Sequence, residues 1–158
     1  MNIFKVWREE CRLQPAKPCG PRARLATGSE YQFHPEIERV SGDLYRAGNF
    51  RPAVMDAFIH VIDTVKTKSG IGDKHGDPLM NLAFGCDKQK PKIQFNPLSN
   101  EAEEDEQRGI MYLFKGVVAM RNYKVHKVSL FDDPGRAHEY LALASLLLRL
   151  LDLARVNP

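Results

Sequence analysis

The hydrophobic positions from residue 34 onward recur every three or four residues, which predicts helices rather than strands. The first such pattern begins at Pro35 and ends at Gly48, a residue suited to the left-handed turn that closes a helix. A second begins after Asn49, its predicted cap, and ends near Gly70. Because their connection is very short, we expect these two helices to pack antiparallel. Their apolar faces contain Ile37, Val40, Leu44 and Ala47 in the first helix, and Val54, Ala57, Phe58, Val61, Ile62 and Val65 in the second.

A third, shorter helix is predicted to begin at Asp77, its cap, and to end near Phe84. Residues 85–100 contain several Gly, Pro and Asn residues, so we expect them to form a loop. The acidic run at 101–106 suits a helix N-terminus because carboxylates stabilise the helix dipole there. The alternative for this run is a metal site, but no His or Cys accompanies the carboxylates. The helix that follows is predicted to end near Arg121.

The last helix is predicted to span residues 134–155, with Asp133 as its cap. Its leucines lie on nearly all sides, which is typical of a helix buried against several neighbours. In a small bundle this pattern predicts a contact with a second copy of the chain. Since no strand-like alternation of useful length appears, the predicted fold class is all-α, with a helical domain over residues 34–155.

Residues 1–33 have a different character, with a possible short helix followed by a segment rich in Pro and Gly. This N-terminal arm carries Lys5, Arg8, Arg12, Lys17, Arg22 and Arg24. A basic arm can bind a phosphate backbone, whereas a solvated linker is the other interpretation.

Charge and cysteine content limit the classes of function. The formal net charge is +3 and the pI is near 8.8, which permits nucleic acid as a partner without requiring it. Three cysteines without a C-x-x-C spacing argue against a disulfide framework or a zinc site, and we expect no cofactor. No signal-peptide pattern opens the sequence, and no apolar run is long enough to span a bilayer. We therefore expect a cytoplasmic protein that does not contact the membrane.

Candidate chemistry is concentrated in Arg121, Asn122 and His126. Arg121 follows Val117 by four residues and Phe114 by seven, so it lies on the apolar side of its helix, where a cation needs a partner or a function. We expect Arg121 and Asn122 at the helix end and His126 in the following loop, folded back toward one cleft. The alternative is an ion-paired Arg and a surface His.

These three side chains are suited to cleaving RNA without a metal ion. A base removes the ribose 2′-hydroxyl proton, the 2′-oxygen attacks phosphorus, and an acid protonates the leaving oxygen. Histidine titrates near neutral pH and suits the proton transfers, and the guanidinium fork of arginine matches the phosphoryl oxygens. Asn122 can orient the histidine or the phosphate. The other histidines, His34, His60, His75 and His138, gave less support, although any could meet His126 in space.

Residues 34–152 resemble the Ymh-type branch of the HEPN superfamily, which is found in bacterial and phage-related genomes. The stretches that carry the resemblance are His34–Ile37, Leu44–Phe50, Asp77–Phe84, Gly109–Gly116, Arg121-Asn122 with His126, and Glu139–Ser145. The resemblance implies an up-and-down helical bundle that dimerises so that two Arg–His motifs face a shared cleft. It also implies a metal-independent ribonuclease of toxin–antitoxin, abortive-infection or CRISPR systems, with Arg121, Asn122 and His126 as its site. Val128 stands where some toxin branches have a Tyr.

Our leading hypothesis is a homodimeric ribonuclease whose dimer forms through the last helix and the Arg121/His126 region. Arg121 stabilises phosphate charge, His126 transfers protons and Asn122 orients. The lysines predicted to hold RNA are Lys88, Lys90, Lys92, Lys124 and Lys127. The alternative is a non-catalytic binding or dimerisation module, in which an acid such as Asp132 or Asp133 pairs with Arg121. A third hypothesis is a regulator of a larger toxin complex that acts through the basic N-terminal arm. A further expected partner of the protein is an antitoxin or a defence-system protein.

Overall fold

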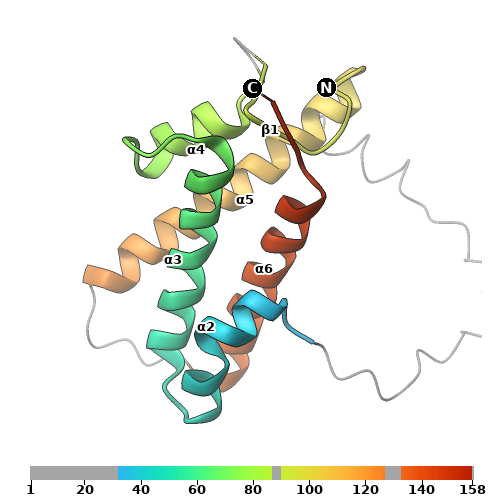
Figure 1. Cartoon of the computed structure of the whole chain (residues 1–158). Coiled ribbons are helices and arrows are strands. Elements are labelled where there is room, and N and C mark those ends of the chain that lie inside the picture. The colour runs from blue at the N-terminus through green and yellow to red at the C-terminus, as the bar shows by residue number, and fades with distance from the viewer. Residues whose placement is uncertain (1–31, 87–89, 127–132, 158) are drawn as a thin grey trace, which may run out of the picture. The chain divides into compact units, whose positions relative to one another are not determined.

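Five helices and one two-stranded sheet make up the part of the chain that the structure describes, which is residues 32–86, 90–126 and 133–157. The structure is a computed structural model, and for residues 123–126 it describes the backbone. The predicted all-α class is confirmed (Figure 1). The predicted N-terminal arm lies outside the described residues. The elements are α2 (Pro35–Arg46), α3 (Phe50–Ser69), α4 (Gly76–Phe84), β1 (Ile93–Gln94), α5 (Glu101–His126), α6 (Pro134–Leu153) and β2 (Arg155–Val156).

Helix α3 is the centre of the bundle, because α2, α5 and α6 all pack against it (Figure 1). Its stripe of Val54, Phe58, Val61 and Val65 is fully buried, as its spacing predicted. Each fully buried large apolar side chain contributes about 1.5–3 kcal/mol relative to an exposed one. The core is continuous with the buried faces of α4 and α5, so the position of α5 relative to α3 is fixed by packing.

Most predicted helix boundaries are confirmed. Helix α2 is followed by Gly48 at φ 78°, and α3 by Gly70 at φ 70°, both in the left-handed region. The side chain of Asp133 caps α6 by accepting a hydrogen bond from the Arg136 N–H at 2.9 Å. Asn49 precedes α3 as predicted, but its side chain makes no capping hydrogen bond.

Three predicted helix boundaries were wrong: the start of α4, the end of α5 and the end of α6. Helix α4 begins at Gly76, after His75 at the cap position, so Asp77 lies in the first turn rather than at the cap. Helix α5 does not end near Arg121 but continues to His126. No Gly or Pro follows Arg121 within this stretch, so nothing in the local sequence breaks the helix.

The short sheet was not predicted, and it explains why α6 ends at Leu153 rather than at residue 155. Strand β2 pairs antiparallel with β1, with Ile93 opposite Val156. The buried side chain of Asn157 then donates to the Pro91 carbonyl at 2.7 Å and to Oε1 of Gln94 at 3.0 Å. These contacts hold the last described residues of the chain against the segment between α4 and α5.

Gln107 fixes the N-terminal half of α5. Its fully buried amide donates to the carbonyls of Phe84 and Ile93, both at 2.9 Å, and accepts from the Phe95 N–H at 3.0 Å. Beside it, the rings of Phe84 and Phe114 stack with centroids 4.6 Å apart. These contacts fix the rotation of α5 about its own axis. The same rotation determines which residues of its later turns face α3.

Candidate functional site

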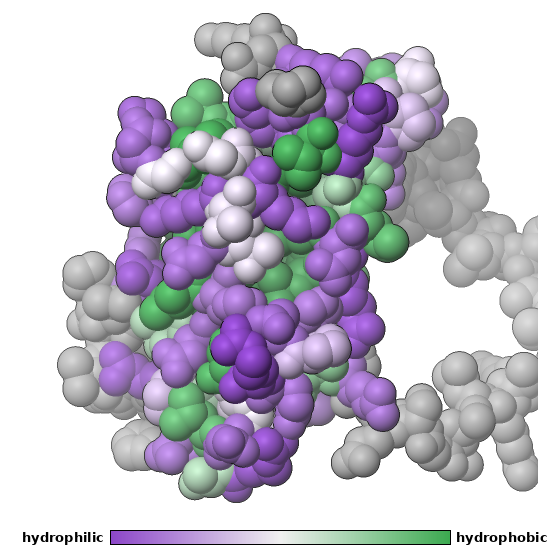
Figure 2. Space-filling model, in the orientation of Figure 1, coloured by the Kyte–Doolittle hydropathy of each residue, from purple (hydrophilic) through white to green (hydrophobic). Residues whose placement is uncertain are grey.

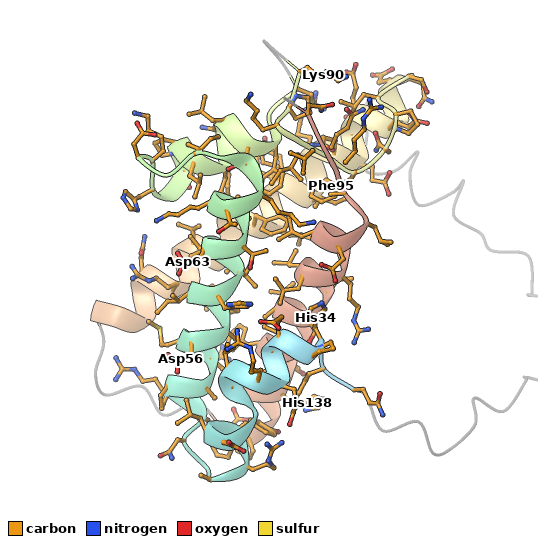
Figure 3. All side chains as sticks on the ribbon, viewed as in Figure 1. His34, Asp56, Asp63, Lys90, Phe95 and His138 are labelled. Carbon is orange, nitrogen blue, oxygen red and sulfur yellow. The ribbon has the colours of Figure 1, made fainter. Side chains whose placement is uncertain are left out.

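An open cleft of about 310 Å³ lies between α3 and α5 at the start of α4. Asp63, labelled in Figure 3, lies on the α3 side of this cleft. Polar and charged side chains share it with a small apolar surface. Its lining residues are Ile59, Ile62, Asp63, Lys66, His75, Gly76, Val118, Arg121 and Asn122.

Helical spacing accounts for the two walls. On α3, Ile62, Asp63 and Lys66 lie within one turn of each other on one face of the helix, and on α5 so do Val118, Arg121 and Asn122. Val118 is 5% exposed and belongs to the core, so it forms an apolar base beneath the polar rim. The cleft therefore lies where the contact between α3 and α5 reaches the surface and polar side chains follow the apolar ones of the core.

Arg121 projects from the α5 wall beside Asn122. Its guanidinium donates to Oδ1 of Asn122 at 3.3 Å, and its side chain is only partly exposed. No carboxylate among the described residues lies within ion-pair distance of Arg121. Asp133, one predicted partner, instead caps α6, and Asp132 lies outside the described residues. The cation is therefore held in place by an amide while its charge stays available to the cleft.

His75 enters the cleft from the third side because of a sharp turn. His75 is extended, with φ −138° and ψ 161°, and Gly76 follows at φ 62° to begin α4. A residue other than glycine is strained at such a φ, so the glycine permits this entry angle. The Nδ1 atom of His75 lies 3.0 Å from Nζ of Lys66, which links the start of α4 to the last turn of α3.

Of the three predicted catalytic residues, the structure brings Arg121 and Asn122 together in the cleft. The prediction that His126 lies in a loop was wrong, because it is the last residue of α5, one turn after Asn122. Its side chain lies outside the described residues, and its catalytic role stays a prediction.

Of the predicted RNA-binding lysines, Lys90 and Lys92 have described side chains, and neither of them lines this cleft. Lys90 and Lys92 precede β1, and Figure 3 shows Lys90 near β1, away from Asp63. The backbone carbonyl of Lys92 accepts from the Asn157 N–H at 2.9 Å, so this segment has a structural role. Lys88 and Lys127, and the side chain of Lys124, lie outside the described residues.

Sequence reasoning missed Lys66 and Asp63 and gave little weight to His75. The spacing of Ile59, Ile62, Asp63 and Lys66 could have shown that they share a face of α3. Nothing in the sequence indicates that this face meets the C-terminal half of α5, because that depends on the packing of both helices.

Two other histidines have structural partners. The ring of His34 caps α2 by accepting from the Glu36 N–H at 3.2 Å through Nδ1, and its Nε2 lies 2.8 Å from Asp152 on α6. Nε2 of His60 lies 3.3 Å from the carboxylate of Glu36. A hydrogen bond from Arg39 is the main cause that lowers the pKa of this carboxyl group.

The cleft combines cationic and neutral donors with one carboxylate acceptor, an arrangement that can bind an anion which also carries hydroxyl groups. Within the described ranges, no group of three or more His, Cys, Asp or Glu side chains is arranged to hold a metal ion. None of the described helices has both the length and the apolar character required to cross a bilayer.

Comparison with protein families gives one match. The sequence model of the family described as "Protein of unknown function (Hypoth_ymh)" matches residues 31–151 and so covers all of α2–α5 and most of α6. Neither the curated proteins nor the solved structures contain a significant match to the chain. The family description carries no activity, so any function has to be argued from the cleft.

Proposed function

The chain belongs to the Hypoth_ymh family, and from the cleft geometry we propose that it is a metal-independent endoribonuclease of the HEPN type. The observation that carries the proposal is the placement of Arg121 and Asn122 in an open cleft, with no described carboxylate paired to the arginine. The guanidinium stabilises the charge that develops on the phosphoryl oxygens during cleavage. The HEPN resemblance of residues 34–152 supports the same assignment.

In the proposed reaction, His126 takes the proton of the 2′-hydroxyl group, and the 2′-oxygen attacks the adjacent phosphorus. The bond from phosphorus to the 5′-oxygen breaks, and that oxygen takes a proton from the protonated His126, which returns the ring to its neutral form. The products are a 2′,3′-cyclic phosphate and a 5′-hydroxyl end. Asn122, already bonded to Arg121 at 3.3 Å, keeps the guanidinium oriented during these steps. The proposed role of this activity is phage defence, abortive infection or a toxin–antitoxin pair in the cytoplasm, which is what the HEPN resemblance implies.

The proposed active form is a homodimer formed through α6 and the Arg121/His126 region. On α6, Leu146 is 46% exposed and Leu153 is 86% exposed, so the core of one copy does not bury all the apolar side chains of this helix. The same observation favours a second candidate, a non-catalytic dimerisation module. In Figure 2, hydrophobic residues appear on the drawn face as patches among hydrophilic ones.

The deciding experiment is cleavage of a mixed-sequence single-stranded RNA, with chelator present, by the wild type and by His126→Ala. The matched control is His60→Ala, because His60 lies outside the cleft and contacts Glu36. We expect the wild type and the control to leave 2′,3′-cyclic phosphate ends, and His126→Ala to lose activity roughly 100- to 10,000-fold while staying folded. Equal cleavage by His126→Ala rejects this role for His126, and no cleavage by a folded dimeric wild type favours the dimerisation module.

A further inference from the structure

Three groups that are not explained by the Arg–Asn–His motif line the same cleft as Arg121. Lys66 and Asp63 come from α3, and His75 comes from the residue that precedes α4. These segments are separate in the sequence from the end of α5, so the packing of the bundle brings them together. A ligand that fills the cleft meets all of them along with the guanidinium.

The contact between Lys66 and His75 assigns the ring's hydrogen-bonding roles. Nζ of Lys66 lies 3.0 Å from Nδ1 of His75, and a lysine ammonium group has donors but no acceptor. Nδ1 therefore accepts the hydrogen bond, and the proton of the neutral ring is on Nε2. Within the described part of the chain, Nε2 of His75 has no hydrogen-bond partner, so it remains a donor for a ligand.

Asp63 makes the cleft selective, because its carboxylate can only accept hydrogen bonds. Among the described residues, no cation lies within ion-pair distance of this carboxylate. An anion that carries no proton, such as sulfate, has nothing to donate to Asp63 when Lys66 and Arg121 hold it. A phosphate attached to a sugar does, because a hydroxyl of the sugar donates.

We propose that the cleft is the binding site for one ribose phosphate of an RNA strand. Arg121, Lys66 and Nε2 of His75 donate to the phosphoryl oxygens. Asp63 accepts from the 2′-hydroxyl of the ribose on the 5′-oxygen side of that phosphate, which is not the hydroxyl that His126 deprotonates. This inference deepens the proposed ribonuclease by naming residues that recognise its substrate. The cleft volume of about 310 Å³ lies at the lower end of small-ligand sites, which suits a single nucleotide unit. Ile62 and Val118 form the apolar surface against which the sugar packs.

The test measures RNA binding by the His126→Ala variant. If the proposed chemistry is correct, this variant leaves the RNA uncleaved, and if it is not, the substitution should not affect binding. The ligands are an RNA tetranucleotide, the DNA tetranucleotide of the same sequence, and a nucleoside monophosphate. Affinity is measured by calorimetry, and the imidazole signals of His75 are followed by NMR, with His75→Gln used to assign them. Lys66→Ala is compared with Lys115→Ala, a matched control on α5 that does not line the cleft.

We expect RNA to shift the His75 signals and to bind more tightly than DNA. Lys66→Ala should weaken RNA binding roughly tenfold or more, because a hydrogen bond from a charged group is lost, and Lys115→Ala should not. Asp63→Ala should remove the preference for RNA over DNA. Undetectable RNA binding, unchanged His75 signals, or equal affinities for the two lysine variants overturn the proposal. Equal affinity for the monophosphate and the RNA also overturns it, because a free nucleotide then explains the site.

Failure of the two proposals is distinguishable. Binding with these signatures but no cleavage by the wild type rejects the ribonuclease and retains the ribose-phosphate site. The other outcome is that His126→Ala loses cleavage, while Lys66→Ala leaves RNA affinity unchanged and RNA leaves the His75 signals unchanged. This outcome retains the ribonuclease and rejects the ribose-phosphate site.

Discussion

The two ends of α5 use polar residues in opposite ways. Near its start, the buried amide of Gln107 makes three backbone hydrogen bonds, one to the last residue of α4 and two to the segment that includes β1. Near its end, Arg121 is partly exposed and has only a 3.3 Å contact to Asn122 among the described residues, beside an open cleft. The first end satisfies its polar groups within the fold, and the second leaves donors available.

This difference distinguishes polar residues that stabilise the fold from polar residues that are available to bind a ligand. A buried polar group whose bonds are all made inside the chain stabilises the fold, and leaving its partners unpaired is costly. Donors from separate helices that converge on open space have a different role, because the fold uses only part of their hydrogen-bonding capacity: Arg121 contacts Asn122 and Lys66 contacts His75. The following predictions test this distinction along α5 and its neighbours.

The largest expected effect is on activity at the C-terminal end of α5. Arg121→Ala should lower RNA cleavage roughly 100- to 1,000-fold, because a donor to the developing charge is lost. The free energy of unfolding should change by about 0.5 kcal/mol or less, since Arg121 bonds no described carboxylate. Cleavage kinetics and urea unfolding measure the two quantities, with Lys115→Ala as the control. A large loss of stability without loss of rate would show that Arg121 is structural.

The opposite result is expected at the N-terminal end. Gln107→Ala should destabilise the protein by about 3 kcal/mol, because it leaves two carbonyls and one N–H buried without partners. Urea unfolding measures this change, and Glu104→Ala, at an exposed position on the same helix, is the control. At temperatures where the variant is folded, its catalytic rate should match the wild type. An unchanged midpoint contradicts the structural role of Gln107.

A smaller effect is expected where the two roles meet, at Gly76. Gly76→Ala should cost about 1 kcal/mol of stability, because φ 62° is strained for alanine, whereas no atom lies close enough to clash. It should also weaken RNA binding, because it displaces His75. Gly72→Ala is the matched control, since it has open space and no positive φ. Thermal unfolding and calorimetry measure both effects, and equal behaviour of the two variants rejects this role for the turn.

The smallest effect concerns a surface ion pair away from the cleft. Arg39→Ala should raise the pKa of Glu36 toward its usual value, because the hydrogen bond that mainly lowers it is removed. A lowered pKa in the folded state gives stability that is present above the unfolded pKa and is lost as the pH falls through the folded one. The variant should therefore lose part of this acid-side pH dependence. Carbon-detected NMR titration of the carboxyl group measures the pKa, and no upward shift contradicts the assignment.

Local signals predicted the fold well. The signals that mark helix ends depend on residues within one turn of the end. The structure confirms three of them: Asp133 at the start of α6, and Gly48 and Gly70 after α2 and α3. The end of α5 was misplaced because no breaker follows Arg121, and the β1–β2 pairing was missed because two-residue strands leave no periodic signal.

Of the residues that line the cleft, the sequence assigned a functional role to Arg121 and Asn122 alone. Arg121 and Asn122 are neighbours in the sequence, so their association was readable. Lys66 and His75 join them through the packing of α3 and α4, and such packing depends on side-chain fit across elements rather than on spacing within one.

The pairing of β1 with β2 has a consequence for synthesis on the ribosome. Gln94 and Asn157 are 63 positions apart, so at about 5–20 residues per second the first waits several seconds for the second. Early in that interval the nascent chain contains the apolar faces of α2 and α3 but not α6, which packs against both of them in the finished fold. Translation of the last described residues is therefore the step that completes the bundle, and a chaperone has its best opportunity to bind just before it.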